Sequence, residues 1–279
     1  MFDPVYALIP SVIWAFSPIF YRTFMTRFDL LTLNLLRTSL ASAVLAVPAF
    51  YFGFGPSLFY ALASGIITLS VGDSLFLLGI RETGASVAAP VVYTYVLLIQ
   101  LTAPMVGEVV PFTNLVAALM VVAGVYVLSR GGGGAPRAKG IAFALGASLA
   151  WTVGQDLITV ATSAGGNFVS VAFARNLAAA AGLGVAVLAT GRLKRWPAGV
   201  GAKEFGFLAF IAITDLVLGS VLYIYSISLV GIALTAILTS LSPLLTQLFS
   251  KALGKESPSG RDYGGGILIV AALIIALSL

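Results

Sequence analysis

The feature that most constrains the fold of this 279-residue sequence is a succession of long apolar stretches. Because a helix of roughly 20 apolar residues spans the hydrocarbon core of a bilayer, each stretch predicts a transmembrane helix. The chain is 59% hydrophobic and 9% charged, whereas about 25% of the residues of a soluble domain are charged. We therefore predict an all-α integral membrane protein with ten transmembrane helices, at 4–21, 30–52, 57–80, 85–106, 111–129, 140–160, 168–190, 205–228, 231–250 and 263–279.

A stretch of about forty residues occurs twice, at 72–111 and at 219–258. Shifting the chain by 147 positions superposes Gly72 on Gly219, Gln100 on Gln247 and Pro111 on Pro258. A shift of 137 or 138 superposes the earlier pairs, Trp14 on Trp151 and Arg37 on Arg175. Such self-similarity indicates a duplicated structural unit. We expect a first five-helix repeat at 1–130, a Gly-rich linker at 131–139 and a second five-helix repeat at 140–279.

The basic residues predict the orientation. Apart from Arg37 and Arg175, every Lys and Arg falls in a loop after an odd-numbered helix: Arg22, Arg27, Arg81, Arg130, Arg137, Lys139, Arg192, Lys194, Arg195, Lys203, Lys251, Lys255 and Arg261. Basic loops stay in the cytoplasm. We therefore expect a multi-pass protein of the cell membrane, with odd-numbered loops inside and both termini outside. Because each half has five helices, equivalent loops of the two copies face opposite sides, and such inverted repeats are an architecture of secondary transporters.

Three segments carry a family resemblance: IWAFSPIFYR at 13–22, LAWTVGQDLIT at 149–159 and GDSLFLLGIRETGAS at 72–86. The chain resembles the EamA-type members of the drug/metabolite transporter (DMT) superfamily over essentially its whole length. The resemblance implies two inverted five-helix units and a central cavity walled by helices 1, 3, 4, 6, 8 and 9. It also implies transport, often export, of small metabolites such as amino acids. The small multidrug members carry a coupling glutamate in the first helix, whereas Trp14 and Trp151 stand at that duplicated position here.

Five ionisable residues lie inside the apolar segments: Arg37, Asp73, Asp156, Arg175 and Asp215. An unpaired charge in the membrane costs several kcal/mol, so such residues are paired or functional. From their depths we expect Arg37 and Asp73 to form a structural ion pair, and direct binding of substrate is the alternative for both. Arg175 is expected to pair structurally with either Asp156 or Asp215, and the sequence does not choose between them.

Asp215 is the one acid near the membrane midplane, and the repeat pairs it with neutral Thr68. We expect it either to bind substrate and a coupling proton or cation, or to serve as the buried partner of Arg175.

Neutral candidates for substrate binding lie near the middle of the expected cavity-wall helices: Trp14, Thr68, Tyr93, Tyr95, Trp151, Thr152, Ser240 and Ser242. Aromatic faces and hydroxyls suit an amphipathic solute with an amino or carboxyl group. Ordinary helix packing is the alternative, because Ser and Thr are common at helix contacts. Gln100 and Gln247 are expected to form interhelical hydrogen bonds or to act as gate elements.

The sequence has no cysteine and no histidine, so it lacks a thiol nucleophile and the usual general base and metal ligand. We expect no enzyme activity, no catalytic residues, no cofactor and no metal, and no nucleic-acid partner, since the basic residues sit in short loops. We expect a secondary transporter that exports a small amino-acid-like or amphipathic solute by alternating access around a midplane cavity. Its partners are the solute, the lipid bilayer and a coupling proton or cation. The alternatives are a lipid-carrier flippase and an intramembrane aspartyl protease, of which Gly72-Asp73 resembles half a site.

Overall fold

The computed structural model of the chain describes residues 3–83, 85–128, 138–191, 200–253 and 260–278, and the described residues contain helices and no strand. The first half contains α1 (Asp3–Met25), α2 (Leu30–Phe52), α3 (Leu58–Gly65), η1 (Ile66–Gly72), α4 (Asp73–Thr83), α5 (Ala85–Val92), α6 (Tyr95–Thr102), η2 (Ala103–Val106) and α7 (Phe112–Leu128). The second half contains α8 (Ala138–Ser163), α9 (Phe168–Ala189), α10 (Ala202–Ile213), η5 (Thr214–Gly219), α11 (Ser220–Thr239), α12 (Ser242–Ala252) and α13 (Gly260–Leu277).

These elements form the ten predicted spans, numbered here in chain order. Span 3 consists of α3, η1 and α4, and span 4 consists of α5, α6 and η2. Span 8 consists of α10, η5 and the start of α11, whereas span 9 consists of the rest of α11 and α12. The boundary between spans 8 and 9 is a kink at Gly231, whose φ of 79° is open to glycine at no steric cost. Most of the expected linker, 131–139, lies outside the described residues.

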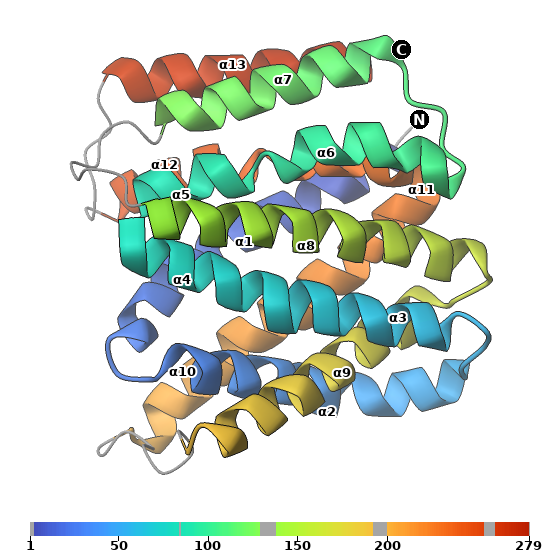
Figure 1. Ribbon diagram of the computed structural model, residues 1–279, viewed down its shortest axis with the longest axis vertical. Coiled ribbons are helices and arrows are strands. Elements are labelled where there is room, and N and C mark those ends of the chain that lie inside the picture. Colours follow the sequence, from blue (N-terminus) through green and yellow to red (C-terminus); the bar gives the residue numbers. More distant parts are fainter. Residues whose placement is uncertain (1–2, 84, 129–137, 192–199, 254–259, 279) are drawn as a thin grey trace.

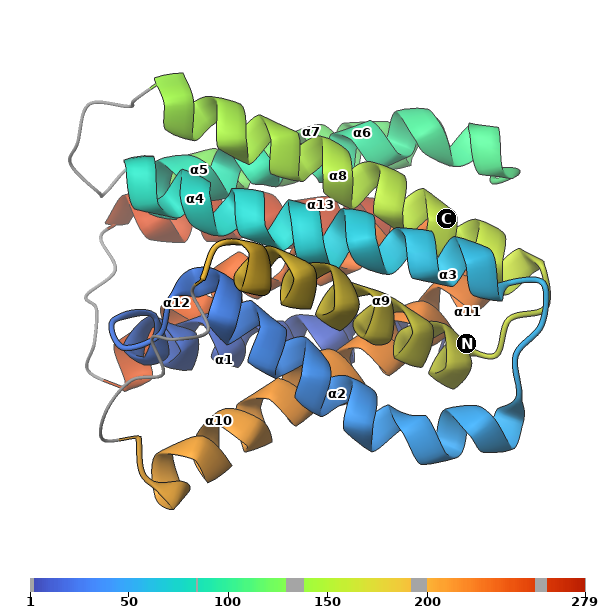
Figure 2. The ribbon, with the colours of Figure 1, turned by 60° about the horizontal axis from the view of Figure 1, so that its bottom comes forward.

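Length and composition support insertion in a membrane. Six helical segments are long and apolar enough to cross one: Pro4–Tyr21, Leu30–Phe52, Leu58–Thr83, Ala138–Ser163, Phe168–Ala189 and Ala202–Thr239. Shorter apolar helices are Tyr95–Val106, Phe112–Leu128 and Tyr263–Leu277. The long helices run side by side, and the N- and C-termini lie at the same end of the bundle (Figures 1 and 2). We call this end, which also holds the loops after even-numbered spans, the even-loop face, and the opposite end the odd-loop face.

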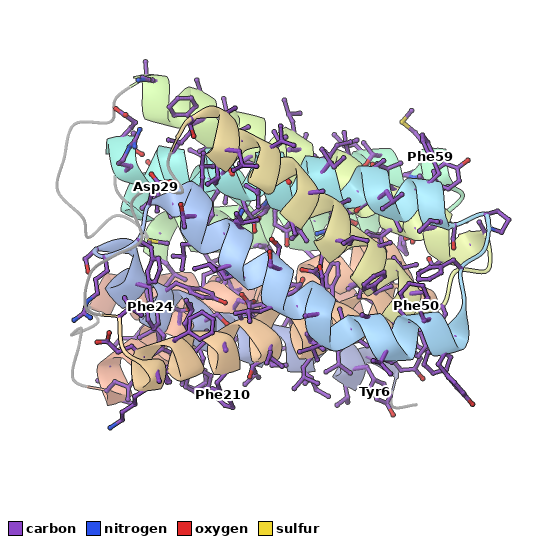
Figure 3. All side chains as sticks on the ribbon, turned by 90° about the horizontal axis from the view of Figure 1, so that it is seen from below. Tyr6, Phe24, Asp29, Phe50, Phe59 and Phe210 are labelled. Carbon is purple, nitrogen blue, oxygen red and sulfur yellow. The ribbon has the colours of Figure 1, made fainter. Side chains whose placement is uncertain are left out.

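Large apolar side chains cover the outside of the bundle. Phe50, Phe59 and Phe210 are 70%, 74% and 66% exposed, and Figure 3 shows Phe50 and Phe59 toward one end of the bundle and Phe24 and Asp29 at the other. Large apolar side chains that are this exposed, on helices long enough to cross a bilayer, are expected in a membrane protein. These side chains are therefore placed to contact lipid.

The second span of each half begins with a side chain that caps the helix. Asp29 Oδ2 accepts a hydrogen bond of 3.1 Å from the amide of Leu31 and so caps α2. Asn167 Oδ1 accepts one of 2.9 Å from the amide of Val169 and caps α9. A side chain in this position satisfies an amide that has no partner inside the helix. A shift of 138 superposes the two capping residues, so the second span of each half begins in the same way.

The duplicated glycines and tryptophans pack across the interface between the halves. A Cβ added at Gly72 would lie 2.5 Å from Trp151 Cδ1, and one added at Gly219 would lie 2.6 Å from Trp14 Nε1. The third span of the first half thus packs on the first span of the second half. In the same way, the third span of the second half packs on the first span of the first half. Small residues permit this close approach of membrane helices.

Candidate functional site

Two π-helical segments occupy equivalent places in the two halves. They are η1 in span 3 and η5 in span 8, and a shift of 147 superposes Gly72, the last residue of η1, on Gly219, the last residue of η5. In η1 the amide of Asp73 bonds the carbonyl of Thr68, five residues earlier. Such segments widen a helix and often occur at functional sites. They carry Thr68 and Asp215, two of the predicted site residues.

Spans 4 and 9 are each interrupted near the middle. In span 4, α5 ends at Val92 and α6 begins at Tyr95, whereas in span 9, α11 ends at Thr239 and α12 begins at Ser242. The shift of 147 superposes both sides of the two interruptions. Discontinuous helices in corresponding positions of two repeats are the usual location of a transporter binding site. The interruptions hold the predicted site residues Tyr93, Tyr95, Ser240 and Ser242.

Arg37 and Asp215 form an ion pair, with Nη2 2.8 Å from Oδ2 and side-chain exposures of 12% and 7%. The guanidinium carbon also lies 4.2 Å from the ring centre of Tyr21. The expectation that Arg37 pairs directly with Asp73 is therefore wrong. The physical reason is that η5 packs against α2 and brings Asp215 within reach of Arg37.

Asp73 accepts a hydrogen bond from Trp151 instead, at 3.1 Å between Oδ1 and the indole Nε1. The Trp151 ring stands edge-on to Tyr95, with centroids 5.5 Å apart, and to Phe76, with centroids 5.3 Å apart. Tyr93 and Tyr95 have ring centroids 5.8 Å apart. Three predicted site residues therefore meet in one aromatic cluster beside a carboxylate.

Arg175 is 3% exposed and donates through Nε to Ser64 Oγ at 3.0 Å. The Ser64 hydroxyl in turn donates to the carbonyl of Gly154 at 2.6 Å. No carboxylate of the described residues lies within 4 Å of Arg175. Arg175 thus forms a direct ion pair with neither Asp156 nor Asp215, because its side chain is directed at α3 and Asp215 is held by Arg37.

The remaining candidates make mostly local contacts. Trp14 Nε1 donates to the backbone carbonyl of Asp215 at 3.3 Å. Thr68 is 4% exposed, and its Oγ1 has no hydrogen-bond partner among the described residues. Ser240 and Ser242 donate to the carbonyls of Ile237 and Thr239 in their own span. Thr152 likewise donates within its own helix, to the carbonyl of Ser148. These three hydroxyl groups already use their protons in local bonds.

Both repeated glutamines form interhelical hydrogen bonds, as predicted. Gln100 Nε2 donates to the carbonyl of Ala233 at 3.1 Å, and Gln247 Nε2 donates to the carbonyl of Leu128 at 3.2 Å. The partners are not equivalent under the repeat. The two repeated glutamines therefore connect different pairs of spans: Gln100 joins span 4 to span 9, and Gln247 joins span 9 to span 5.

Reasoning from the sequence missed Ser64, Tyr223 and Glu108. The Tyr223 ring lies 5.0 Å from Trp14, and its buried hydroxyl has no partner among the described residues. The repeat alignment contained this signal, because Tyr223 superposes on Phe76, whose ring lies 5.3 Å from that of Trp151. Nothing in the sequence indicated that Glu108 would reach span 9.

Glu108 connects the loop after span 4 to span 9 at the even-loop face. Its two carboxylate oxygens accept hydrogen bonds from the amides of Ile232 and Ala233, at 2.5 and 3.1 Å, directly after the kink at Gly231. A carboxylate at the start of a helix satisfies free amides and complements the helix dipole. At the same face, a Cβ added at Gly166 would lie 2.7 Å from Ser57 Cβ, so those loops are in close contact.

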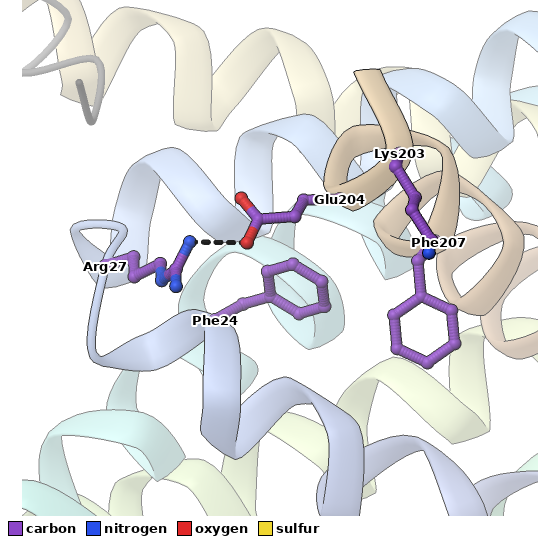
Figure 4. Close-up of a pocket in the computed structure, with 5 residues that line it drawn as sticks. All are labelled: Phe24, Arg27, Lys203, Glu204 and Phe207. Atoms are coloured by element: carbon purple, nitrogen blue, oxygen red, sulfur yellow. Dashed lines mark hydrogen bonds and ion pairs between the residues drawn. The ribbon is translucent and has the colours of Figure 1, made fainter. Parts of the chain in front are cut away.

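The odd-loop face contains a cavity of about 260 Å³ between the end of α1 and the start of α10. Figure 4 shows the five residues that line it, Phe24, Arg27, Lys203, Glu204 and Phe207. Arg27 Nη1 lies 2.6 Å from Glu204 Oε1 across this cavity, and both side chains are substantially exposed. An exposed pair of this kind contributes little to stability. This end is held less tightly than the even-loop face.

Comparison with known proteins agrees with this architecture. A solved crystal structure matches with a TM-score of 0.78 and 21% sequence identity, covering 99% of this chain and 96% of that chain, which shows a shared fold. No curated protein matches the chain. The model of the EamA-like transporter family, a family of transporters and not of enzymes, matches at residues 3–130 and again at 138–278. The chain therefore belongs to the EamA-like transporter family.

Proposed function

We propose that the protein is a secondary transporter that exports a small amino-acid-like or amphipathic solute by alternating access. The observation that carries this proposal is the duplicated set of irregular helices in the middle of the membrane. The π-helical segments and the interruptions of spans 4 and 9 fall at equivalent positions of both halves. Irregular backbone at this depth is tolerated where protein buries it or where it lines a cavity. In this protein, charged and aromatic side chains surround the irregular segments.

The contacts at the two faces support a conformation that is closed at the even-loop face. There, Glu108 binds the amides at the start of the second part of α11, and the close packing of Gly166 on Ser57 adds to the closure. At the odd-loop face, the exposed pair of Arg27 and Glu204 crosses a cavity. If the even-loop face opens, the amides of Ile232 and Ala233 lose their hydrogen bonds to Glu108 and must bond to water instead.

Asp215 is our candidate for the coupling group. Its ion pair with Arg37 joins span 2 of the first half to span 8 of the second. A proton or cation that neutralises the carboxylate would release Arg37 and so weaken this connection between the halves. Binding of the coupling ion would thereby change the relative stability of the two access states.

Flux in proteoliposomes tests the proposal. Vesicles that contain the purified protein and a pool of unlabelled L-amino acids should accumulate radiolabelled amino acids in exchange, whereas protein-free vesicles should not. An imposed pH or sodium gradient should change the rate, and Asp215→Asn should abolish that response. Asp156→Asn, which removes a second acid within the membrane, is the matched control and should retain it. Absence of any protein-dependent flux contradicts the proposed function. An unchanged gradient response in Asp215→Asn contradicts only the coupling role.

One observation favours the flippase alternative. An apolar groove of about 430 Å³ lies between α12 and α13, lined by Leu244, Leu248, Tyr263, Gly266, Ile267, Val270, Ala271 and Ile274. A lipid acyl chain has the shape and chemistry for such a groove. If the protein moves lipid, it should transfer a fluorescent lipid between leaflets of proteoliposomes, and Leu248→Trp should slow that transfer. Amino-acid exchange without lipid transfer would exclude this alternative.

A further inference from the structure

Arg175 is a buried cation that has no carboxylate within 4 Å among the residues that the structure describes. Its side chain is 3% exposed, and its hydrogen bond to a described residue runs from Nε to the neutral hydroxyl of Ser64. A buried charge with no ionic partner is strongly unfavourable, and more so in a membrane than in water. We therefore expect that an anion binds to Arg175 at some stage of the transport cycle.

The internal repeat shows which acidic partner Arg175 lacks. Arg37 is the counterpart of Arg175, and its anion is Asp215 in η5. The residue of η1 equivalent to Asp215 is Thr68, which cannot supply a charge. The equivalent site thus combines an arginine of the second half, Arg175, with a neutral residue of the first half, Thr68, and this pair has no acid.

A neutral hydroxyl without a partner among the described residues, that of Thr68, lies in the same part of span 3 as the contact of Arg175 with Ser64. Ser64 and Thr68 stand about one turn apart in span 3, and both are fully or almost fully buried. Thr68 Oγ1 has no partner among the described residues, although it lies against Gly154, whose carbonyl accepts from Ser64. An unsatisfied buried hydroxyl costs free energy unless something bonds to it. A carboxylate beside Arg175 would accept from this hydroxyl as well.

Asp73 does not neutralise Arg175 directly. It lies within electrostatic range of Arg175 but beyond 4 Å, and one of its oxygens is bonded to Trp151. It adds a negative charge in the neighbourhood of Arg175. A solute that carried only negative charge would be repelled by it, whereas the ammonium of an amino acid would be attracted.

We propose that Arg175, with the hydroxyl of Thr68, binds the carboxylate of the transported solute. The inference rests on the proposed transport function and narrows its substrate to small molecules with a carboxylate. The guanidinium forms two parallel hydrogen bonds with such a group, which a lysine cannot do. Because Arg175 is closed off in this conformation, the solute reaches it when the two halves separate.

The test is thermal unfolding of the purified protein in detergent with two matched ligand series. L-Leucine, L-phenylalanine, L-threonine and L-glutamine are compared with their α-carboxamides, which keep the ammonium and lack the carboxylate. At least one amino acid at saturating concentration should raise the Tm of the wild-type protein by about 5 °C, and its amide should not. Arg175→Gln should abolish the shift, and Arg175→Lys should restore part of it.

The other buried arginine is the control for folding. Arg37→Gln leaves Asp215 uncompensated and should lower the Tm of the ligand-free protein clearly. Arg175→Gln removes a charge that has no anion, so the ligand-free Tm should stay within about 2 °C of the wild type. A loss as large as that of Arg37→Gln would show a structural role and overturn the inference.

Three further outcomes would also overturn the inference: equal stabilisation by the amides, a ligand shift retained in Arg175→Gln, or no shift with any of the four amino acids. A flux measurement in proteoliposomes distinguishes failure of this inference from failure of the proposed transport function. If labelled solutes without a carboxylate exchange across proteoliposomes and Arg175→Gln carries them normally, the inference fails and the transport function stands. If no solute moves, the transport function itself fails.

Discussion

Arg37 and Asp215 connect the two halves of the protein through an ion pair of 2.8 Å in the membrane. The arginine belongs to the second span of the first half and the aspartate to the third span of the second half. Both side chains are largely buried, so the pair is shielded from the water that weakens surface ion pairs. Any motion of one half against the other must preserve or replace this contact.

The first prediction concerns the strength of that pair. Arg37→Met or Asp215→Asn alone should each cost about 3–5 kcal/mol, because the remaining charge is buried without its partner. The double variant should cost less than the sum of the two single changes. A double-mutant cycle by chemical unfolding in detergent measures the difference. The cycle of Arg37→Met with Asp73→Asn is the control, and it should show a smaller coupling. Additive losses for Arg37 and Asp215 would mean that the pair is not formed.

The second prediction concerns the packing of the duplicated glycines. Gly72→Ala and Gly219→Ala place a methyl group against Trp151 and Trp14, where there is no room, and should each cost about 1–3 kcal/mol. Gly206→Ala is the matched control, since a Cβ there meets nothing within 4 Å. It should be neutral or stabilising by up to about 1 kcal/mol, because alanine favours helix more than glycine. Equal effects at all three sites would contradict the described interface.

The sequence predicted the order and approximate ends of the helices well, because apolar length and loop composition are local signals. The pairing of charges was predicted less well. Depth along a helix placed Arg37 and Asp73 at similar levels, but it carried no information on which side of each helix faces which neighbour. The π-helical turn in η5 shifts the register of span 8, and no propensity pattern marks such a turn. The interruptions of spans 4 and 9 were not predicted: Pro90 and Pro243 lie near them, but a proline alone does not determine whether a helix bends or ends.

The internal repeat carries information beyond the helix ends. It pairs Phe76 with Tyr223, and each of them lies against the tryptophan of the opposite half. It also pairs Asp215 with Thr68, the difference that leaves Arg175 without an acid. Positions where one half has a charged or hydroxyl group and the other half lacks it are therefore informative from the sequence alone.

The third prediction concerns the closure of the even-loop face by Glu108. Glu108→Ala leaves the amides of Ile232 and Ala233 without their acceptors and should cost about 1–3 kcal/mol. Glu108→Gln keeps one acceptor oxygen and should cost less. Hydrogen exchange followed by mass spectrometry should show faster exchange at the start of the second part of α11 in the alanine variant. Unchanged exchange there would show that Glu108 does not hold this face closed.

The fourth prediction concerns orientation. The sequence has no cysteine, so Thr26→Cys and Ser163→Cys give clean single sites that are exposed at opposite faces. An impermeant thiol reagent added to intact cells should label position 163, and it should label position 26 only after permeabilisation. The reverse pattern would invert the orientation and leave the inverted repeat intact.

The fifth prediction concerns alternating access, in which the middle of the protein is reached in turn from each side of the membrane. Tyr95→Cys places a thiol in the aromatic cluster beside Trp151, and Ala117→Cys places one in the buried core of α7 as a control. Labelling rates are measured with an impermeant thiol reagent added first outside and then inside oriented vesicles. Position 95 should react from each side in turn, and position 117 should react from neither. Reaction of position 95 from one side only, or from neither, would contradict alternating access.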